Sequence, residues 1–273
     1  MATNWPTPDA ADGKAIRLIP IGVAGGADRV NVFIHGYRSL VTPEAIGLAG
    51  RRVMASGVAG ESWIVDWPSG GWASSAKATA ATLAGLRAAY RVARIRHVLA
   101  PWMLLVDAGV ISLTEVARFK LMERRAERVG PHLVKPLADL AAGRPVNLIG
   151  HSLGGRVVHH VLGADWPEGL AIQDAVLLAG AADLEADDWP DCVRRLRGTL
   201  FNAYSPRDRV LRLAPDLRRR VGGRPMAEVT VDGVAKVVNH HCQGVGHVDY
   251  WTQIDRLLPT IWPHCRTGAT RLP

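Results

Sequence analysis

A serine flanked by glycines stands where a buried strand would turn into a helix. The sequence Gly-His-Ser-Leu-Gly-Gly at residues 150–155 follows an apolar run at 146–149 and precedes a helical pattern. A serine at such a tight turn takes strained backbone angles, and its glycines leave room where a Cβ would meet neighbouring backbone. The turn pushes the Ser152 hydroxyl out of the sheet, beside the free amide of Leu153 at the helix start. The pattern therefore predicts a nucleophile elbow.

Short β-branched runs alternate with helical patterns along the chain, which is typical of a mostly parallel sheet with helices on both faces. With 273 residues and 48% hydrophobic content, the chain can bury a sizeable core. We expect a single α/β domain over residues 1–273. In such a sheet the ligand binds beyond the carboxyl ends of the strands, so the loops after the runs should carry the chemistry. The predicted strands are residues 30–34, 62–66, 146–149, 175–178, 199–204 and 228–231.

The segment at about residues 73–142 is longer than one crossover between strands requires, and it lacks strand-like alternation. It is interpreted as an all-helical insertion that Pro101 and Gly130-Pro131 divide. Its apolar stretch at 98–113 falls short of the roughly 20 residues needed to span a bilayer. Two interpretations stay open, namely extra scaffold on the sheet and a cap over an acyl pocket. The predicted helices are residues 73–97, 102–110, 114–129 and 131–141.

A serine nucleophile needs a base and an orienting carboxylate, and both can follow it along the chain in the order Ser, Asp, His. Asp208 comes four residues after the predicted strand 199–204, in the turn at its carboxyl end. It is the preferred acid, and Asp183, after the preceding strand, is the alternative. His247 lies in a glycine-containing loop after the last strand, which makes it the preferred base.

An early predicted strand ends in His-Gly-Tyr, which places a second loop near the elbow. The His-Gly step bends the backbone there, so the amide of Tyr37 is expected to complete an oxyanion hole with the amide of Leu153. Gly36 is the second choice of donor, and His35 is expected to order the loop. Gly36 and His151 are the predicted substrate-binding residues, with a structural role as the alternative for His151.

Lys and Arg outnumber Asp and Glu by 33 to 25, which gives a formal net charge of +8. Arginines cluster at 194–197 and 218–220, where they can attract anionic lipid headgroups or nucleic acid. A solvated helix face is the simpler explanation. We therefore expect no nucleic-acid partner, while a peripheral membrane contact stays open.

Three cysteines are too few and too unpatterned for a disulfide framework, which favours a reducing compartment. The first residues lack the basic and apolar segments of a secretory signal, so we expect a cytoplasmic location. His240 and His241 lie too close to a strand to be the first choice of base. Together with Cys242 and His247 they match no common zinc spacing, and no metal or cofactor is expected.

These motifs together resemble the α/β-hydrolase superfamily. They are residues 35–37, 150–155, 205–208 and 246–247, and the first two resemble lipase and esterase signatures. Finer details resemble bacterial hydrolases of undescribed function and the hydrolase domain of transmembrane and coiled-coil domain proteins. Those details are residues 67–69, 144–150 and 202–205, and the spacing of His247 and Tyr250. The resemblance covers most of residues 30–258 and implies an α/β-hydrolase fold with a helical insertion. It does not specify a substrate, because this fold hosts many chemistries.

The expected function is hydrolysis of carboxylic esters, of the esterase or lipase type, on a small-molecule ester or lipid. Ser152, His247 and Asp208 would act as a catalytic triad through an acyl-enzyme. Thioesterase, amidase and acyltransferase activities are alternatives within the same fold. An alternative of another class is a non-catalytic binding or membrane-docking protein that uses residues 98–113 and the arginine clusters. The oligomeric state stays open.

Overall fold

An eight-stranded sheet forms the centre of the protein in a computed structural model that describes residues 3–5, 16–24, 28–37, 39, 41–70, 113–212 and 219–266. Its strand order is β1-β2-β4-β3-β5-β6-β7-β10. β2 runs antiparallel to both of its neighbours, and the strands from β4 to β10 pair in parallel, which confirms the predicted mostly parallel sheet. The strands are β1 (Thr3–Trp5), β2 (Ile16–Ala24), β3 (Val30–Ile34), β4 (Gly60–Asp66), β5 (Val146–His151), β6 (Ile172–Leu178), β7 (Leu200–Tyr204) and β10 (Val237–His241).

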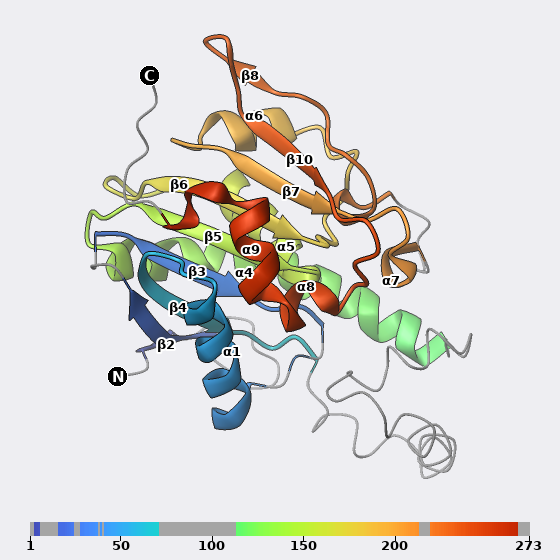
Figure 1. The fold of residues 1–273 in the computed structure, drawn as a ribbon, viewed down its shortest axis with the longest axis horizontal. Helices are drawn as coiled ribbons and strands as arrows, with labels where there is room; N and C mark the ends of the chain where they lie inside the picture. The colour runs from blue at the N-terminus through green and yellow to red at the C-terminus, as the bar shows by residue number, and fades with distance from the viewer. Residues whose placement is uncertain are drawn as a thin grey trace.

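Helices cover both faces of this sheet (Figure 1). In this view α1 (Pro43–Ala55), α8 (Asp249–Thr252) and α9 (Ile254–Ile261) lie in front of the strands. Behind them lie α4 (Leu113–Ala141) and α5 (Leu153–Gly163), and α6 (Trp189–Arg194) packs against α5. The described residues also form the short helices α7 (Arg209–Arg212), η2 (Val221–Gly223) and η3 (Pro263–Arg266). Within the described ranges, no helix combines the length and the apolar character that crossing a bilayer requires.

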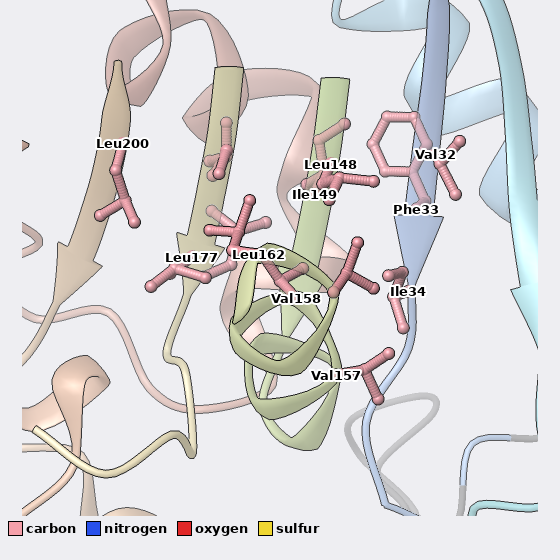
Figure 2. Close-up of a cluster of buried hydrophobic side chains, with 14 of the residues drawn as sticks. Val32, Phe33, Ile34, Leu148, Ile149, Val157, Val158, Leu162, Leu177 and Leu200 are labelled. Atoms are coloured by element: carbon pink, nitrogen blue, oxygen red, sulfur yellow. The ribbon is translucent and has the colours of Figure 1, made fainter. Parts of the chain in front are cut away.

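The core beneath α5 fixes the direction in which this helix leaves the sheet. Figure 2 shows Val157, Val158 and Leu162 of α5 beside apolar side chains of β3, β5 and β6. All three are fully buried, as are Leu148 and Leu177 on the strands. Central parallel strands are covered on both faces, which explains why their sequences are mostly apolar. The turn between β5 and α5 is thus held from both of its ends.

The prediction that residues 228–231 form the last strand of the central sheet is wrong. Only Thr230–Val231 (β8) is extended there, and it pairs antiparallel with Val234–Ala235 (β9) in a separate hairpin. Asp232 and Gly233 between them have φ angles of 51° and 79°. Two successive positive φ values are what an Asp-Gly turn of type I′ requires. The strand that completes the sheet is β10, which follows this hairpin and leads to the loop of His247.

Part of the predicted helical insertion is described, and there it forms a single long helix. The predicted helices 73–97 and 102–110 lie outside the described residues. The predicted break at Gly130-Pro131 is wrong, because α4 continues through both residues. A proline removes one helical hydrogen bond, but packing against α5 holds the helix together. The contact is close, since a Cβ on Gly130 would lie 2.5 Å from the His160 Cβ.

Asp174, near the amino end of β6, joins several elements of the core. Its buried carboxylate accepts hydrogen bonds from the Thr199 backbone N–H and from the Trp262 indole N–H, each at 2.8 Å. The Asp174 backbone N–H donates to Asn147 Oδ1 on β5, at 3.2 Å. These contacts tie β5 and β6 to the start of β7 and to the end of α9.

We expect Asp174→Ala to lower the free energy of unfolding by about 2 to 3 kcal/mol, because it leaves two buried donors without their acceptor. Urea unfolding followed by circular dichroism measures the change. Asp139→Ala is the control, since Asp139 forms an exposed ion pair with Lys135 one helical turn away. Loss of such a pair costs less than about 0.5 kcal/mol. Equal shifts in the two variants would contradict the structural role of Asp174.

Candidate active site

Ser152 lies at a strained turn between β5 and α5. Its φ and ψ angles are 55° and −122°, so a residue with a side chain occupies a backbone region that usually requires glycine. The neighbouring backbone comes very close, because a Cβ on Gly154 would collide with the carbonyl oxygen of Ile34. This geometry is that of a nucleophile elbow. With the strand order, the antiparallel β2 and the elbow after β5, the chain has an α/β-hydrolase fold.

The structure brings Ser152, His247 and Asp208 into one line of hydrogen bonds. The Ser152 Oγ lies 2.9 Å from the His247 Nε2, and the His247 Nδ1 lies 2.7 Å from the Asp208 Oδ2. An Nδ1–H that donates to the carboxylate leaves Nε2 free to accept the hydroxyl proton. All three side chains are buried. They come from loops that follow β5, β7 and β10, at the carboxyl edge of the sheet.

The second carboxylate oxygen of Asp208 is also held. Its Oδ1 accepts a hydrogen bond from the Leu211 backbone N–H at 3.1 Å, which fixes the carboxylate at the start of α7. The alternative acid, Asp183, points elsewhere. Its Oδ1 accepts from the Glu185 N–H at 3.1 Å, within its own loop. The geometry thus favours Asp208 as the partner of His247.

The loop after β3 passes directly beside the nucleophile. A Cβ on Gly36 would lie 2.6 Å from the Ser152 Cβ. Tyr37 is buried, and its ring meets Phe119 of α4 edge-on at 5.6 Å between centroids. Leu153 is the first residue of α5, a position whose N–H has no acceptor within the helix. Of the two predicted oxyanion donors, Tyr37 therefore lies in the loop that passes beside Ser152, and Leu153 is the residue that follows Ser152 in the chain.

The contacts of His35 hold this loop in place. Its Nδ1–H donates to the Gly36 carbonyl at 3.1 Å, and its own carbonyl accepts from the Trp67 indole N–H at 3.0 Å. The His35 and Trp67 rings also stack, with centroids 5.8 Å apart. Burial lowers the pKa of His35, which keeps the ring neutral. These contacts agree with the ordering role expected for His35.

His151 makes a contact that the sequence did not predict. Its Nε2–H donates to the backbone carbonyl of His247 at 2.8 Å. The ring centroid lies 5.2 Å from that of His247 and stacks on Trp251 at 6.4 Å. Burial, with a smaller contribution from the neighbouring His247, lowers the pKa of His151 to about 3. The side chain predicted to bind substrate is thus hydrogen-bonded to the loop of the base.

The other histidines near the carboxyl end of the sheet, His240 and His241, belong to β10 itself. They are its last two residues, and the His241 ring stacks on Tyr204 at 5.3 Å. Cys242 is buried, with its Sγ 3.8 Å from the His240 carbonyl oxygen. All three cysteines are free and buried.

A cluster of metal-ligating residue types lies away from the elbow, on α5 and α6. The ligand atoms of His159, Asp188 and Cys192 all fall within 4.8 Å of one another. The His159 Nε2–H donates to the Asp188 carboxylate at 2.9 Å. Burial raises the pKa of the Cys192 thiol to about 12. The Cys192 Sγ lies 3.9 Å from the Asp188 carboxylate, so both other members of the cluster contact Asp188.

Two of the clustered arginines that the structure describes contact other parts of the protein. Arg220 is 2% exposed, and it donates to the Glu123 carboxylate of α4 at 2.6 Å. Arg195 lies over the Trp166 ring at 4.2 Å and donates to the Leu162 carbonyl at 2.7 Å. The sequence predicted that the arginines at 218–220 lie on a docking surface or on a solvated helix face. Both predictions are wrong for Arg220, because its side chain is buried.

A family model described as "Protein of unknown function (DUF726)" matches residues 101–262, which is more than half of the chain. An uncharacterized membrane protein of Caenorhabditis elegans, F35D11.3, is 27% identical over 146 residues, which cover 50% of this chain and 23% of that protein. The chain thus spans about a quarter of the length of this relative.

Solved structures with a similar fold include two hydrolases. The esterase domain of a Rhodothermus marinus protein is 16% identical, with a TM-score of 0.41 and coverage of 97% of this chain and 98% of that one. Dienelactone hydrolase from Anabaena variabilis is 14% identical, with a TM-score of 0.41 and coverage of 96% and 98%. The fold assignment itself follows from the strand order and the elbow described above.

Proposed function

The chain belongs to the DUF726 family of unknown function, and we propose that it is a serine hydrolase that cleaves carboxylic esters, of the esterase or lipase type. One observation carries the proposal. A serine at a strained strand-to-helix turn is hydrogen-bonded to a histidine that is hydrogen-bonded in turn to a buried aspartate. A buried arrangement of these three residue types is the constellation that activates a hydroxyl for acyl transfer.

In the proposed reaction the Ser152 Oγ attacks the acyl carbon while the His247 Nε2 takes the hydroxyl proton. Asp208 holds the imidazolium that forms, and the backbone amides of Tyr37 and Leu153 bind the negatively charged oxygen. The Nε2 proton then passes to the departing alcohol, which leaves an acyl-enzyme. A water molecule gives a proton to Nε2 as it attacks the acyl group, and Nε2 then passes that proton to the Ser152 Oγ as the bond to the acyl group breaks and the acid leaves.

The proposed substrate is a small-molecule ester or a lipid, and no cofactor enters this chemistry. Thioester cleavage and transfer of the acyl group to an alcohol use the same steps with a different leaving group or acceptor. A cytoplasmic location is part of the proposal, and the free, buried cysteines support a reducing compartment. A peripheral membrane contact is compatible with a lipid substrate.

The proposal is tested by labelling the purified protein with a fluorophosphonate and locating the adduct by mass spectrometry. We expect one adduct, on Ser152, together with hydrolysis of aryl esters of short to long acyl chains. A matched thioester, an amide and an added alcohol acceptor separate the neighbouring activities. Emulsified lipid separates a lipase, whose rate rises at the interface, from an esterase. Absence of labelling together with absence of turnover across the panel would refute the hydrolase function.

A further inference from the structure

Two consecutive residues of the elbow contact the same histidine. The Ser152 Oγ lies 2.9 Å from the Nε2 of the His247 ring. The preceding residue, His151, donates from its Nε2 to the His247 backbone carbonyl at 2.8 Å. The ring and the backbone of His247 are thus each held by a side chain of one rigid turn. We propose that His151 is a positioning residue that sets the distance between Ser152 and His247, an inference that rests on the proposed function.

The turn that presents His151 is well fixed. The Ser152 N–H donates to the Leu178 carbonyl at 3.0 Å, and the Ser152 carbonyl accepts from Gly155 at 2.9 Å and from Ala181 at 2.8 Å. His151 itself is the last residue of β5 and pairs with Leu178 of β6. A side chain on such a rigid backbone can hold a hydrogen-bond donor at a fixed position beside a neighbouring loop.

The backbone of the His247 loop is bonded to the elbow through His151. Its residues Val245 and Gly246 are bonded within the turn itself, to the Cys242 carbonyl at 3.4 Å and to the Asp249 carboxylate at 2.9 Å. These local bonds shape the turn, but they do not tie it to the elbow. The bond from His151 crosses from β5 to this loop. It therefore controls how deeply the loop approaches Ser152.

A histidine suits this position for two reasons. The flat ring of His151 lies near two other rings, with its centroid 5.2 Å from that of His247 and 6.4 Å from that of Trp251. The neutral ring also keeps a second positive charge away from His247 when that ring takes the Ser152 proton. The charged or titratable groups around His151 are His247, Asp208 and His35, and burial lowers its pKa to about 3, so it carries no charge near neutral pH.

His151→Phe keeps a flat ring and removes the donor, and we expect it to lower kcat on an aryl ester by about 10- to 100-fold with little change in KM, because small misplacements of reacting groups cost rate. The rate of fluorophosphonate labelling should fall in parallel. His151→Gln restores an N–H donor of similar reach and should be clearly faster than His151→Phe. His132→Phe, on the exposed side of α4, is the matched control and should behave like the parent.

An NMR measurement separates this inference from the hydrolase function itself. The His247 Nδ1–H shared with Asp208 should give a low-field proton signal, which Asp208→Asn identifies by its loss. His151→Phe should broaden or shift this signal while thermal unfolding stays at the parent temperature. An unlabelled, inactive parent that shows this NMR effect would refute the hydrolase function and keep the positioning role. Parent-like labelling and an unchanged signal in His151→Phe, or equal losses in the Phe and Gln variants, would overturn the positioning role.

Discussion

Ser152→Ala should lose all fluorophosphonate labelling and about 10⁴-fold or more of kcat/KM on aryl esters. Removal of the nucleophile from a triad leaves only the assistance that the oxyanion donors and substrate binding provide. The change removes only the hydroxyl oxygen and leaves the Cβ and the backbone of the turn as they are, so the fold should persist. Intact-mass spectrometry after labelling and initial rates on a chromogenic ester measure the two effects.

Ser62→Ala is the matched control for this substitution. Ser62 is a fully buried serine on β4, and its hydroxyl has no hydrogen-bond partner among the described residues. The variant should be labelled and should turn over esters like the parent. Retained turnover in Ser152→Ala, with full labelling on another residue, would show that the nucleophile is assigned wrongly.

Asp208→Asn is expected to lower kcat by about 10⁴-fold while the protein stays folded. An amide carries no negative charge to stabilise the imidazolium, and its NH₂ group can force His247 into the tautomer that cannot accept the Ser152 proton. The Asp208 carboxylate has two tasks, since it also accepts the Leu211 N–H through Oδ1. An asparagine oxygen can keep that second bond, so the loss should be catalytic. Steady-state kinetics and the thermal unfolding temperature separate the two effects.

Asp183→Asn supplies the comparison for the acid. Asp183 follows the neighbouring strand β6 and accepts a hydrogen bond inside its own loop. Its variant should keep kcat near that of the parent. A large loss in Asp183→Asn beside a small one in Asp208→Asn would reverse the assignment of the triad acid.

The elbow was predictable because its causes are local. The glycine clearance and the strained serine depend on a few consecutive residues and on the strand and helix at each end. The central strands were predictable for a similar reason, since both of their faces are buried and their sequences show it. β2 was missed because Pro20 and Gly22 interrupt its pattern, and the structure has a register shift at that point.

The course of α4 and the contact of His151 depend on distant segments. Gly130 and Pro131 locally favour a break, but α5 packs closely enough on the helix to keep it continuous. His151 is one of two residues flanking Ser152 in the elbow, and nothing near it in the chain indicates a partner. That partner is the carbonyl of a residue 96 positions away.

The amino-acid sequence by itself indicated the candidate side chains for the proposed chemistry and the loops in which they lie. Chemistry needs particular residue types, and in a parallel sheet the carboxyl ends of the strands lie along one edge. The hydrogen bonds that support the preference for Asp208 over Asp183, and the link from His151 to His247, depend on tertiary packing. Ser152 and His247 are 95 residues apart and His247 and Asp208 are 39 apart, so their distances are set by the order and register of the strands between them.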